Sequence, residues 1–200
     1  MGYGSSGTQY LKTTYAYDDV DRLTRLTYAD GAREEYVYDP TSNLTSRTTP
    51  AGQAISYAYD ALNRLTTKIT PEQTTSYSYD AGSRLLSAVD GGSLLTWTYD
   101  ARDQVTQART IAPGLLATLN YAYDPAGHRT QLTDHRGTVF TSTYDALHRL
   151  TQLSEGPIPV ATFSYDALSR RADLQLANGT TTLYQYTATN QLQYLRTTNA

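Results

Sequence analysis

The chain has 200 residues, of which 39% are hydrophobic and 18% are charged, and its formal net charge is −3. This charge excludes the basic footprint expected of a protein that binds nucleic acid or an anionic membrane surface, and the lack of cysteine excludes disulfides and thiolate metal sites. Tyrosine occurs 19 times. Because tyrosine and threonine side chains fit a pleated, half-buried surface, the composition predicts an all-β protein.

The first residues of the chain differ from the rest in composition. Residues 1–9, MGYGSSGTQ, are rich in glycine and serine and lack the charged and apolar regions of a signal peptide. We expect them to be a flexible segment or a remnant of cloning. No apolar run in the sequence approaches the roughly 18 residues of a membrane span. We expect residues 10–200 to form a single domain that consists of one repeat array.

A tyrosine, followed by aspartate in eight of nine copies, recurs at steps of 20 to 24 residues, and an arginine stands four residues after the aspartate in five copies. The motif residues are Tyr17, Asp18, Arg22, Tyr38, Asp39, Tyr59, Asp60, Arg64, Tyr79, Asp80, Arg84, Tyr99, Asp100, Tyr123, Asp124, Tyr144, Asp145, Arg149, Tyr165, Asp166, Arg170 and Tyr186. In the other four copies the arginine position holds Asn43, Gln104, His128 or Gln191. The chain opens before a complete repeat, which suggests a segment of a longer array.

Each copy has the pattern of a β-hairpin. In eight of the nine copies an aromatic residue two positions before the tyrosine shares its face of a strand, because side chains alternate with a period of two; the seventh copy has Ser142 there. The aspartate and the three residues after it have the composition of a turn in which the carboxylate caps backbone N–H groups. A second strand begins at the arginine position and the residue after it, and ends at a glycine-containing turn such as Ala29–Gly31 or Asn178–Gly179. Nine hairpins predict about 18 antiparallel strands and no helix.

Two features of this array carry further expectations. The longest step contains residues 107–121, QARTIAPGLLATLNY, where Pro113–Gly114 predicts a longer loop inserted between hairpins. A sheet of 18 strands is too wide to remain flat, because strand twist accumulates. We therefore expect repeated antiparallel hairpins in a curled or spiralling sheet, or a barrel-like shell segment, with tyrosines stacked in ladders on one face. Open sheet edges predict homo-oligomers that form through those edges.

The motif in residues 15–23, YAYDDVDRL, and in residues 57–65, YAYDALNRL, resembles the RHS or YD repeat family, and the resemblance covers nearly all of residues 10–200. It implies hairpins that spiral into a hollow shell, which in the toxins of the family encloses a cytotoxic domain. By this resemblance the chain would be a structural module of a shell that encapsulates or displays a toxin or effector. Its partners would be the rest of the parent shell and the enclosed domain, within a secreted or cell-surface bacterial protein.

The family also implies one element that this sequence lacks. Many of its shells carry two DPxG motifs for self-cleavage. Here Asp124–Gly127 is the single copy and lies inside an ordinary repeat, so autoproteolysis is not expected.

The same residues also allow a catalytic interpretation. A pair such as Asp60 and Arg64 could act as an acid and an electrostatic stabiliser, but an enzyme needs one preorganised constellation and this pair recurs along the chain. Turn capping by aspartate and bridging across the hairpin by arginine is the simpler interpretation. The three histidines do not have a metal-binding spacing. We expect no enzyme activity, no catalytic, cofactor-binding or metal-binding residue, and no cofactor. An adhesion module that binds carbohydrate or protein through exposed tyrosine, threonine and arginine is the alternative function.

Overall fold

The computed structural model describes residues 12–199, so the expectation of a flexible segment over residues 1–9 lies outside the described residues. All 18 regular elements in this range are β-strands, which confirms the all-β prediction. The described range contains no helix with the length and hydrophobicity that crossing a bilayer requires.

The chain divides into two compact units, the first ending at Leu94 and the second beginning at Leu95. The strands of the first unit are β1 (Thr14–Tyr17), β2 (Leu23–Thr27), β3 (Arg33–Tyr38), β4 (Leu44–Thr48), β5 (Ala54–Tyr59), β6 (Leu65–Ile69), β7 (Thr74–Tyr79) and β8 (Leu85–Val89). Those of the second are β9 (Leu94–Tyr99), which starts one residue before the boundary, β10 (Val105–Ala112), β11 (Leu115–Tyr123), β12 (Arg129–Thr133), β13 (Val139–Tyr144), β14 (Leu150–Glu155), β15 (Ile158–Tyr165), β16 (Arg171–Leu176), β17 (Thr181–Tyr186) and β18 (Leu192–Thr198).

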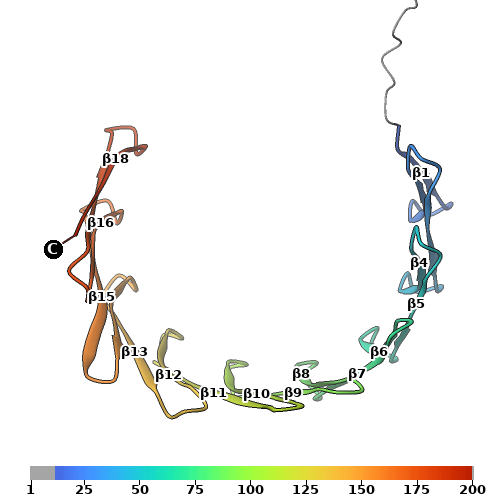
Figure 1. Ribbon diagram of the computed structural model, residues 1–200, viewed down its shortest axis with the longest axis horizontal. Helices are drawn as coiled ribbons and strands as arrows, with labels where there is room; N and C mark the ends of the chain where they lie inside the picture. The colour runs from blue at the N-terminus through green and yellow to red at the C-terminus, as the bar shows by residue number, and fades with distance from the viewer. Residues whose placement is uncertain (1–11, 200) are drawn as a thin grey trace, which may run out of the picture. The chain divides into compact units, whose positions relative to one another are not determined.

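Within each unit every strand pairs with the next strand in chain order, as the sequence predicts for successive hairpins (Figure 1). The ladder of each unit curves along its length. The strands of a unit contact only their neighbours in the sequence, so neither unit closes on itself as a barrel. The fold is therefore the curled array of hairpins, and the alternative of closure is not seen within either unit.

The two ends of the hairpins use different turn chemistry. The turn after the motif tyrosine begins at the motif aspartate, or at Thr187 in the ninth repeat, and the described pairings shift the register by one residue, as between Ala58 and Tyr59. Such a bulge increases the local twist of the strands. At the opposite ends glycines such as Gly31 and Gly179 supply positive φ angles, 86° and 83°. Glycine adopts this left-handed conformation without a Cβ penalty, which explains the glycine-containing turn signals in the sequence.

The longest hairpin corrects one prediction. Pro113 and Gly114 were expected in a longer loop, but they form a two-residue connection between β10 and β11. The additional residues lengthen the strands to 8 and 9 residues. Two-residue turns allow strands to pair up to the turn, and the register indeed continues to the pair Ala112 and Leu115.

The sheets have almost no hydrophobic core. Within residues 12–199, Ala161, at 8% exposure, is the one buried hydrophobic residue, and the buried polar residues are Glu34 and Ser154. β5 shows the typical alternation: Ile55, Tyr57 and Tyr59 are half-buried, while the residues between them are exposed. One face of the strand is thus partly covered by side chains of neighbouring strands, as the period of two predicts.

Candidate functional site

The turn after each motif tyrosine is built around the aspartate. In the third repeat Asp60 Oδ1 accepts hydrogen bonds from the backbone N–H groups of Leu62 at 2.9 Å and Arg64 at 3.0 Å. The Asp60 N–H in turn donates to the Arg64 carbonyl oxygen at 3.0 Å. These contacts, first among them the Arg64 backbone N–H, lower the pKa of Asp60. The carboxylate therefore remains ionised and holds the turn together, which is a structural role.

The residue three positions after the aspartate is a feature that the sequence interpretation missed. It has a left-handed backbone in all nine repeats, with φ between 58° at Asn63 and 92° at Gly127. The N–H of Asn63 donates to the Asp60 carbonyl oxygen at 3.0 Å, which makes a three-residue hairpin loop with a left-handed residue at its end. A partial signal was present, because six of these nine residues are Asn, Asp, His or Gly, which adopt this conformation more readily than other residues, and the other three are Ser. The set is Asp21, Ser42, Asn63, Ser83, Asp103, Gly127, His148, Ser169 and Asn190.

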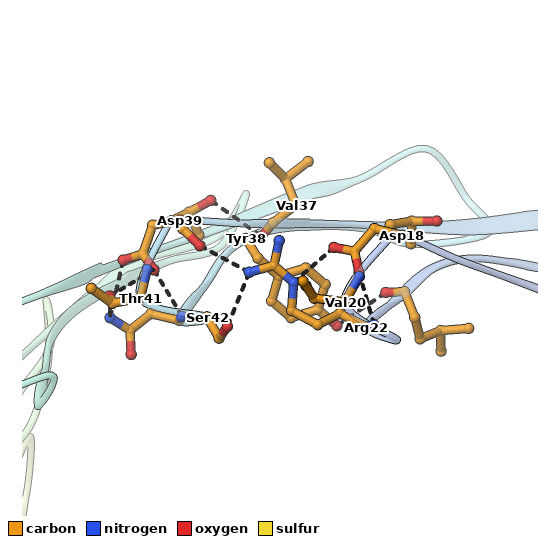
Figure 2. Close-up of polar contacts among 12 residues, drawn as sticks. Asp18, Val20, Arg22, Val37, Tyr38, Asp39, Thr41 and Ser42 are labelled. Atoms are coloured by element: carbon orange, nitrogen blue, oxygen red, sulfur yellow. Dashed lines mark hydrogen bonds and ion pairs between the residues drawn. The ribbon is translucent and has the colours of Figure 1, made fainter.

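The motif arginine connects one hairpin to the next (Figure 2). Arg22 Nε donates to Asp18 Oδ2 at 2.7 Å within its own turn. Its Nη1 donates to the Asp39 carbonyl oxygen at 2.9 Å and lies 3.1 Å from Ser42 Oγ, both in the following turn. The predicted bridge across the hairpin is thus extended, because the guanidinium reaches the neighbouring hairpin as well.

The next motif tyrosine completes this contact. The Arg22 guanidinium lies over the Tyr38 ring, 4.9 Å from its centroid, which is cation–π geometry. The Tyr38 hydroxyl donates to the Leu23 carbonyl oxygen in the preceding hairpin at 3.0 Å. We call this set, an aspartate, the residue four positions later and the next motif tyrosine, the inter-hairpin joint.

The same joint recurs in both units. Guanidinium carbons lie 4.4 to 4.9 Å from the ring centroids in the pairs Arg64–Tyr79, Arg149–Tyr165 and Arg170–Tyr186. The corresponding tyrosine hydroxyls donate to backbone carbonyls of the preceding hairpin at 2.8 to 3.0 Å. The expected stacking of tyrosine on tyrosine is replaced by this alternation. Among the described residues the aromatic ring pairs are His128 with Tyr144 and His128 with His148.

Histidine substitutes for arginine in the sixth repeat. His128 Nδ1 lies 2.8 Å from Asp124 Oδ2, in the place of the arginine Nε. Its ring stacks on Tyr144 of the following repeat with centroids 4.7 Å apart and also on His148, again at 4.7 Å. A flat aromatic ring therefore covers the next tyrosine where a guanidinium does so elsewhere.

Shorter amide side chains make different joints. Asn43 Nδ2 donates to Asp39 Oδ2 at 3.0 Å and to Asn63 Oδ1 of the next turn at 2.8 Å. Gln104 Nε2 donates to the Gly127 carbonyl oxygen at 3.1 Å. The position four residues after the aspartate is therefore the variable element of the joint, and the aspartate turn is the constant one.

A second polar cluster, around Glu34 in the first unit, was not found from the sequence. Glu34 is 6% exposed and accepts hydrogen bonds from the Tyr28 hydroxyl at 2.8 Å and the Tyr36 hydroxyl at 2.6 Å. Arg47 Nη2 pairs with its Oε2 at 2.7 Å. The Tyr36 hydroxyl, followed by that of Tyr28, lowers the pKa of Glu34 against the effect of burial. No repeat signal marked this residue, because glutamate occurs at this position in one repeat alone.

The predicted site residues are thus brought together as joints and not as a single constellation. Each motif aspartate with a described arginine or histidine partner pairs within its own turn, at 2.6 to 2.8 Å. Within residues 12–199, no group of three or more His, Asp or Glu side chains has the arrangement of a metal site.

Comparisons with known proteins agree with this geometry. A family model described as RHS Repeat matches residues 38–75 and 123–156. A comparison with curated protein sequences finds no significant match. A structure of the Photorhabdus luminescens Tc holotoxin pore has a similar fold over 94% of this chain, with a TM-score of 0.79 and 15% identity. A crystal structure of TcdB2–TccC3–TEV is similar over 98% of this chain, with a TM-score of 0.63 and 15% identity.

The similarity covers only part of each of those larger chains. This chain matches 11% of the length of the first and 13% of the length of the second. At this level of identity the structures show a shared fold. Residues 38–75 and 123–156 are therefore similar to RHS repeats, and the solved structures share the fold of the array.

Proposed function

We propose that this repeat array is a structural segment of a β-sheet shell that encloses or displays a toxin or effector domain. The observation that carries the proposal is the inter-hairpin joint, which recurs along the array and uses the same groups wherever the motif has arginine, as with Arg22 and Tyr38 and with Arg170 and Tyr186. A structure in which each repeat contacts its neighbours can be extended by adding repeats. The fold shared with Tc toxin structures supports this interpretation.

The burial pattern also supports a role as a segment of a shell. In a single sheet in which Ala161 is the one buried hydrophobic residue among residues 12–199, both faces remain accessible to solvent or to another polypeptide. One face can then lie against an enclosed polypeptide while the other faces solvent. Backbone hydrogen bonds and joints stabilise such a sheet without a second layer, which suits a container better than a compact catalytic domain.

The partners of this repeat array would be further repeats of the same shell. In each unit the outermost strand has a single neighbour: β1 pairs with β2, and β18 pairs with β17. Tyr15 and Tyr17 in β1 are each 59% exposed, and all residues of β18 are exposed. Preceding and following hairpins of a parent shell, or a second copy of the chain, would cover these edges.

Protease protection tests the enclosing role. In the natural polypeptide that contains this array, a domain enclosed by the shell should resist proteolysis until the shell is unfolded by denaturant. Replacing Arg64 and Arg170 together by alanine should open two joints and make the enclosed domain sensitive. Cleavage of that domain at the same rate in the intact protein and in denaturant would refute encapsulation.

A glycan array separates this role from adhesion. A shell segment should bind no glycan reproducibly. Binding that disappears when exposed tyrosines such as Tyr15 and Tyr17 are replaced by serine would instead favour the adhesion module.

A further inference from the structure

Arginine twice replaces an aliphatic residue at the start of a returning strand, and both cases lie in the second unit. The position that follows the motif arginine holds leucine or valine in seven of nine repeats, but it holds Arg129 at the start of β12 and Arg171 at the start of β16. The contact to the next hairpin is kept, because both arginine carbonyl oxygens accept the hydroxyl of the following motif tyrosine at 3.0 Å. Both arginines are exposed. The two substitutions therefore add cations to the sheet surface without removing this contact.

Both guanidinium groups lie over aromatic rings that stand two positions before a motif tyrosine. The guanidinium carbon of Arg129 is 5.6 Å from the centroid of the Tyr121 ring. That of Arg171 is 5.2 Å from the centroid of Phe163 in its own hairpin and 5.9 Å from that of Tyr184 in the next. These cation–π contacts restrict the orientation of each guanidinium, so its N–H groups are partly preorganised for a ligand.

The rings beneath the two arginines lie on one face of the second unit. Directly opposed residues of paired strands share a face, as do alternate residues of one strand. Tyr121 lies opposite Leu132, and Leu132 lies opposite Phe140. The same succession continues through Phe163 to Tyr184. We call this side of the second unit the ring face, and both guanidinium groups are on it.

The first unit contains a similar arrangement with a carboxylate bound to it. The guanidinium carbon of Arg47 lies 6.0 Å from the centroid of the Tyr36 ring, and its Nε and Nη2 donate to Glu34 Oε2 at 2.9 and 2.7 Å. The Tyr36 hydroxyl donates to the same oxygen at 2.6 Å. An arginine over a ring and the hydroxyl of that ring thus bind one carboxylate together. Arg47 stands further along its strand than the two arginines of the ring face, so the likeness is one of geometry and not of register.

On the ring face the same donors are present without a carboxylate. Within residues 12–199, the guanidinium groups of Arg129 and Arg171 donate no hydrogen bond and pair with no acidic side chain. In the same range the Tyr121 and Tyr184 hydroxyls also donate no hydrogen bond. Each arginine and the tyrosine beside it therefore offer the set of donors that Arg47 and its tyrosine give to their glutamate.

The acidic residues of this region lie elsewhere or are paired. The motif aspartates of the two turns pair with His128 and with Arg170. Asp173 lies opposite Ser164 and so projects from the other face. Glu155 is on the ring face at the last residue of β14, whereas the arginines are the first residues of their strands, which separates them by roughly 17 Å along the strand direction. The arginine end of the ring face is therefore positively charged.

We propose that the ring face of the second unit is a docking surface for an acidic segment of another polypeptide. One aspartate or glutamate carboxylate of that segment is bound by Arg171 and the Tyr184 hydroxyl, and a second by Arg129 and the Tyr121 hydroxyl. Each carboxylate takes the role that Glu34 has in the first unit. The planar fork of arginine suits a carboxylate, because two N–H groups can donate to it at once. The inference does not depend on the shell function.

The spacing of the two arginines defines the ligand further. The strands β12 and β16 are four strands apart in the ladder, which corresponds to about 19 Å at roughly 4.8 Å per strand. An extended peptide covers this distance in about six residues. Two carboxylates six residues apart should therefore reach both sites at once.

Peptide titrations followed by NMR of the full chain test this docking surface. The probe is the heptapeptide ESGSGSE, blocked at both ends, and its matched controls are the isomer EESGSGS and the neutral peptide QSGSGSQ. We expect the probe to cause saturable shifts of the Nε–H signals of Arg129 and Arg171, with a dissociation constant on the order of 1 mM. The isomer should bind at least about threefold more weakly, because its adjacent carboxylates reach one site at a time. The neutral peptide should not saturate.

Three variants locate the binding. Arg171→Gln should weaken binding of the probe at least about threefold, and Tyr184→Phe, which removes a hydroxyl alone, about twofold. Arg196→Gln is the matched control, because Arg196 is exposed and lies opposite Leu183, on the other face. It removes the same charge and should leave the affinity unchanged.

The comparison of the three peptides on the unaltered chain does not depend on how any variant folds. Equal affinities for the probe and its isomer, saturable binding of the neutral peptide, or inorganic sulfate binding as tightly as the probe would overturn the proposal. An Arg196→Gln loss as large as that of Arg171→Gln would also overturn it, because the attraction would then be unspecific.

Discussion

The two units use the same turn but differ in how their hairpins are joined. In the first unit Arg22 and Arg64 each cover the next tyrosine, and the buried Glu34 cluster adds a further link between neighbouring strands. In the second unit the joints begin with Gln104 and His128, and the arginine joints return only at Arg149 and Arg170. The aspartate turn is common to both units, whereas the residue four positions later varies, and we expect that residue to determine how strongly consecutive hairpins are held together.

The largest effect should come from the part that both units share. Asp60→Ala in the first unit and Asp166→Ala in the second each remove two backbone caps and the partner of an arginine. Both variants should lose more stability than any arginine variant, and by similar amounts. Urea unfolding of the full chain, followed by residue-level hydrogen exchange, measures this. A loss confined to one unit would contradict the view that the turn is the constant element.

The next effect should separate the two kinds of joint. Arg64→Ala removes an ion pair, a cation–π contact and a hydrogen bond to the Asp80 carbonyl oxygen, and should cost about 1–2 kcal/mol. Gln104→Ala removes one hydrogen bond to a backbone carbonyl and should cost about 0.5–1 kcal/mol. Local hydrogen-exchange protection in the adjacent strands reports both values. Equal costs would show that the guanidinium adds nothing to the joint.

A smaller effect isolates the tyrosine hydroxyl. Tyr165→Phe keeps the ring beneath Arg149 and removes the 2.8 Å hydrogen bond to the Leu150 carbonyl oxygen. The expected loss is about 1 kcal/mol, the typical net contribution of one hydrogen bond. Tyr194→Phe, on the exposed strand β18, serves as a control and should change the stability little. A loss as large as that of an alanine substitution at Tyr165 would mean that the hydroxyl, and not the ring, supports the joint.

The smallest effect near neutral pH concerns Glu34 and is specific to the first unit. The folded-state pKa of Glu34 is lowered from 4.5, chiefly by the Tyr36 hydroxyl. Its contribution to stability is therefore fully present above pH 4.5 and is lost as the pH falls through the folded-state pKa. Between pH 7 and 5 we expect no change. Below that range the wild type should lose stability more steeply than Glu34→Gln in urea unfolding at each pH. Parallel curves for the two proteins would disprove the assignment.

The hairpins could be predicted from sequence because their causes are local. A strand ends at a tyrosine, an aspartate caps the turn and the next strand begins within six residues. The residues that determine each hairpin therefore lie within one repeat. The repeat then confirms the pattern nine times. Even the left-handed residue, such as Asn63, lies in this local window, and Asn, Asp, His or Gly occupies its position in six of the nine repeats.

The joint could not be predicted in the same way, because its parts lie about one repeat apart. That Arg22 reaches the Asp39 carbonyl depends on the spacing of two paired hairpins, which no local window contains. The Glu34 cluster is harder still, since it occurs once and its burial follows from Tyr28, Tyr36 and Arg47 on three strands or turns. The extended β10–β11 hairpin shows a third limit of prediction from sequence. The composition located the inserted residues, but it did not show whether they lengthened a loop or two strands.

Each inter-hairpin joint connects a hairpin to the next one in the chain, and this affects how the number of repeats can change during evolution. In each arginine joint the arginine comes from one hairpin and the tyrosine from the next, so a hairpin that carries both residues can follow another such hairpin. Loss of residues 150–170 by recombination would place Arg149 before Arg171, where it would meet Tyr186, which is now the partner of Arg170. The array can therefore gain or lose whole repeats in a single genetic event and still fold, so selection can adjust its length as readily as its sequence.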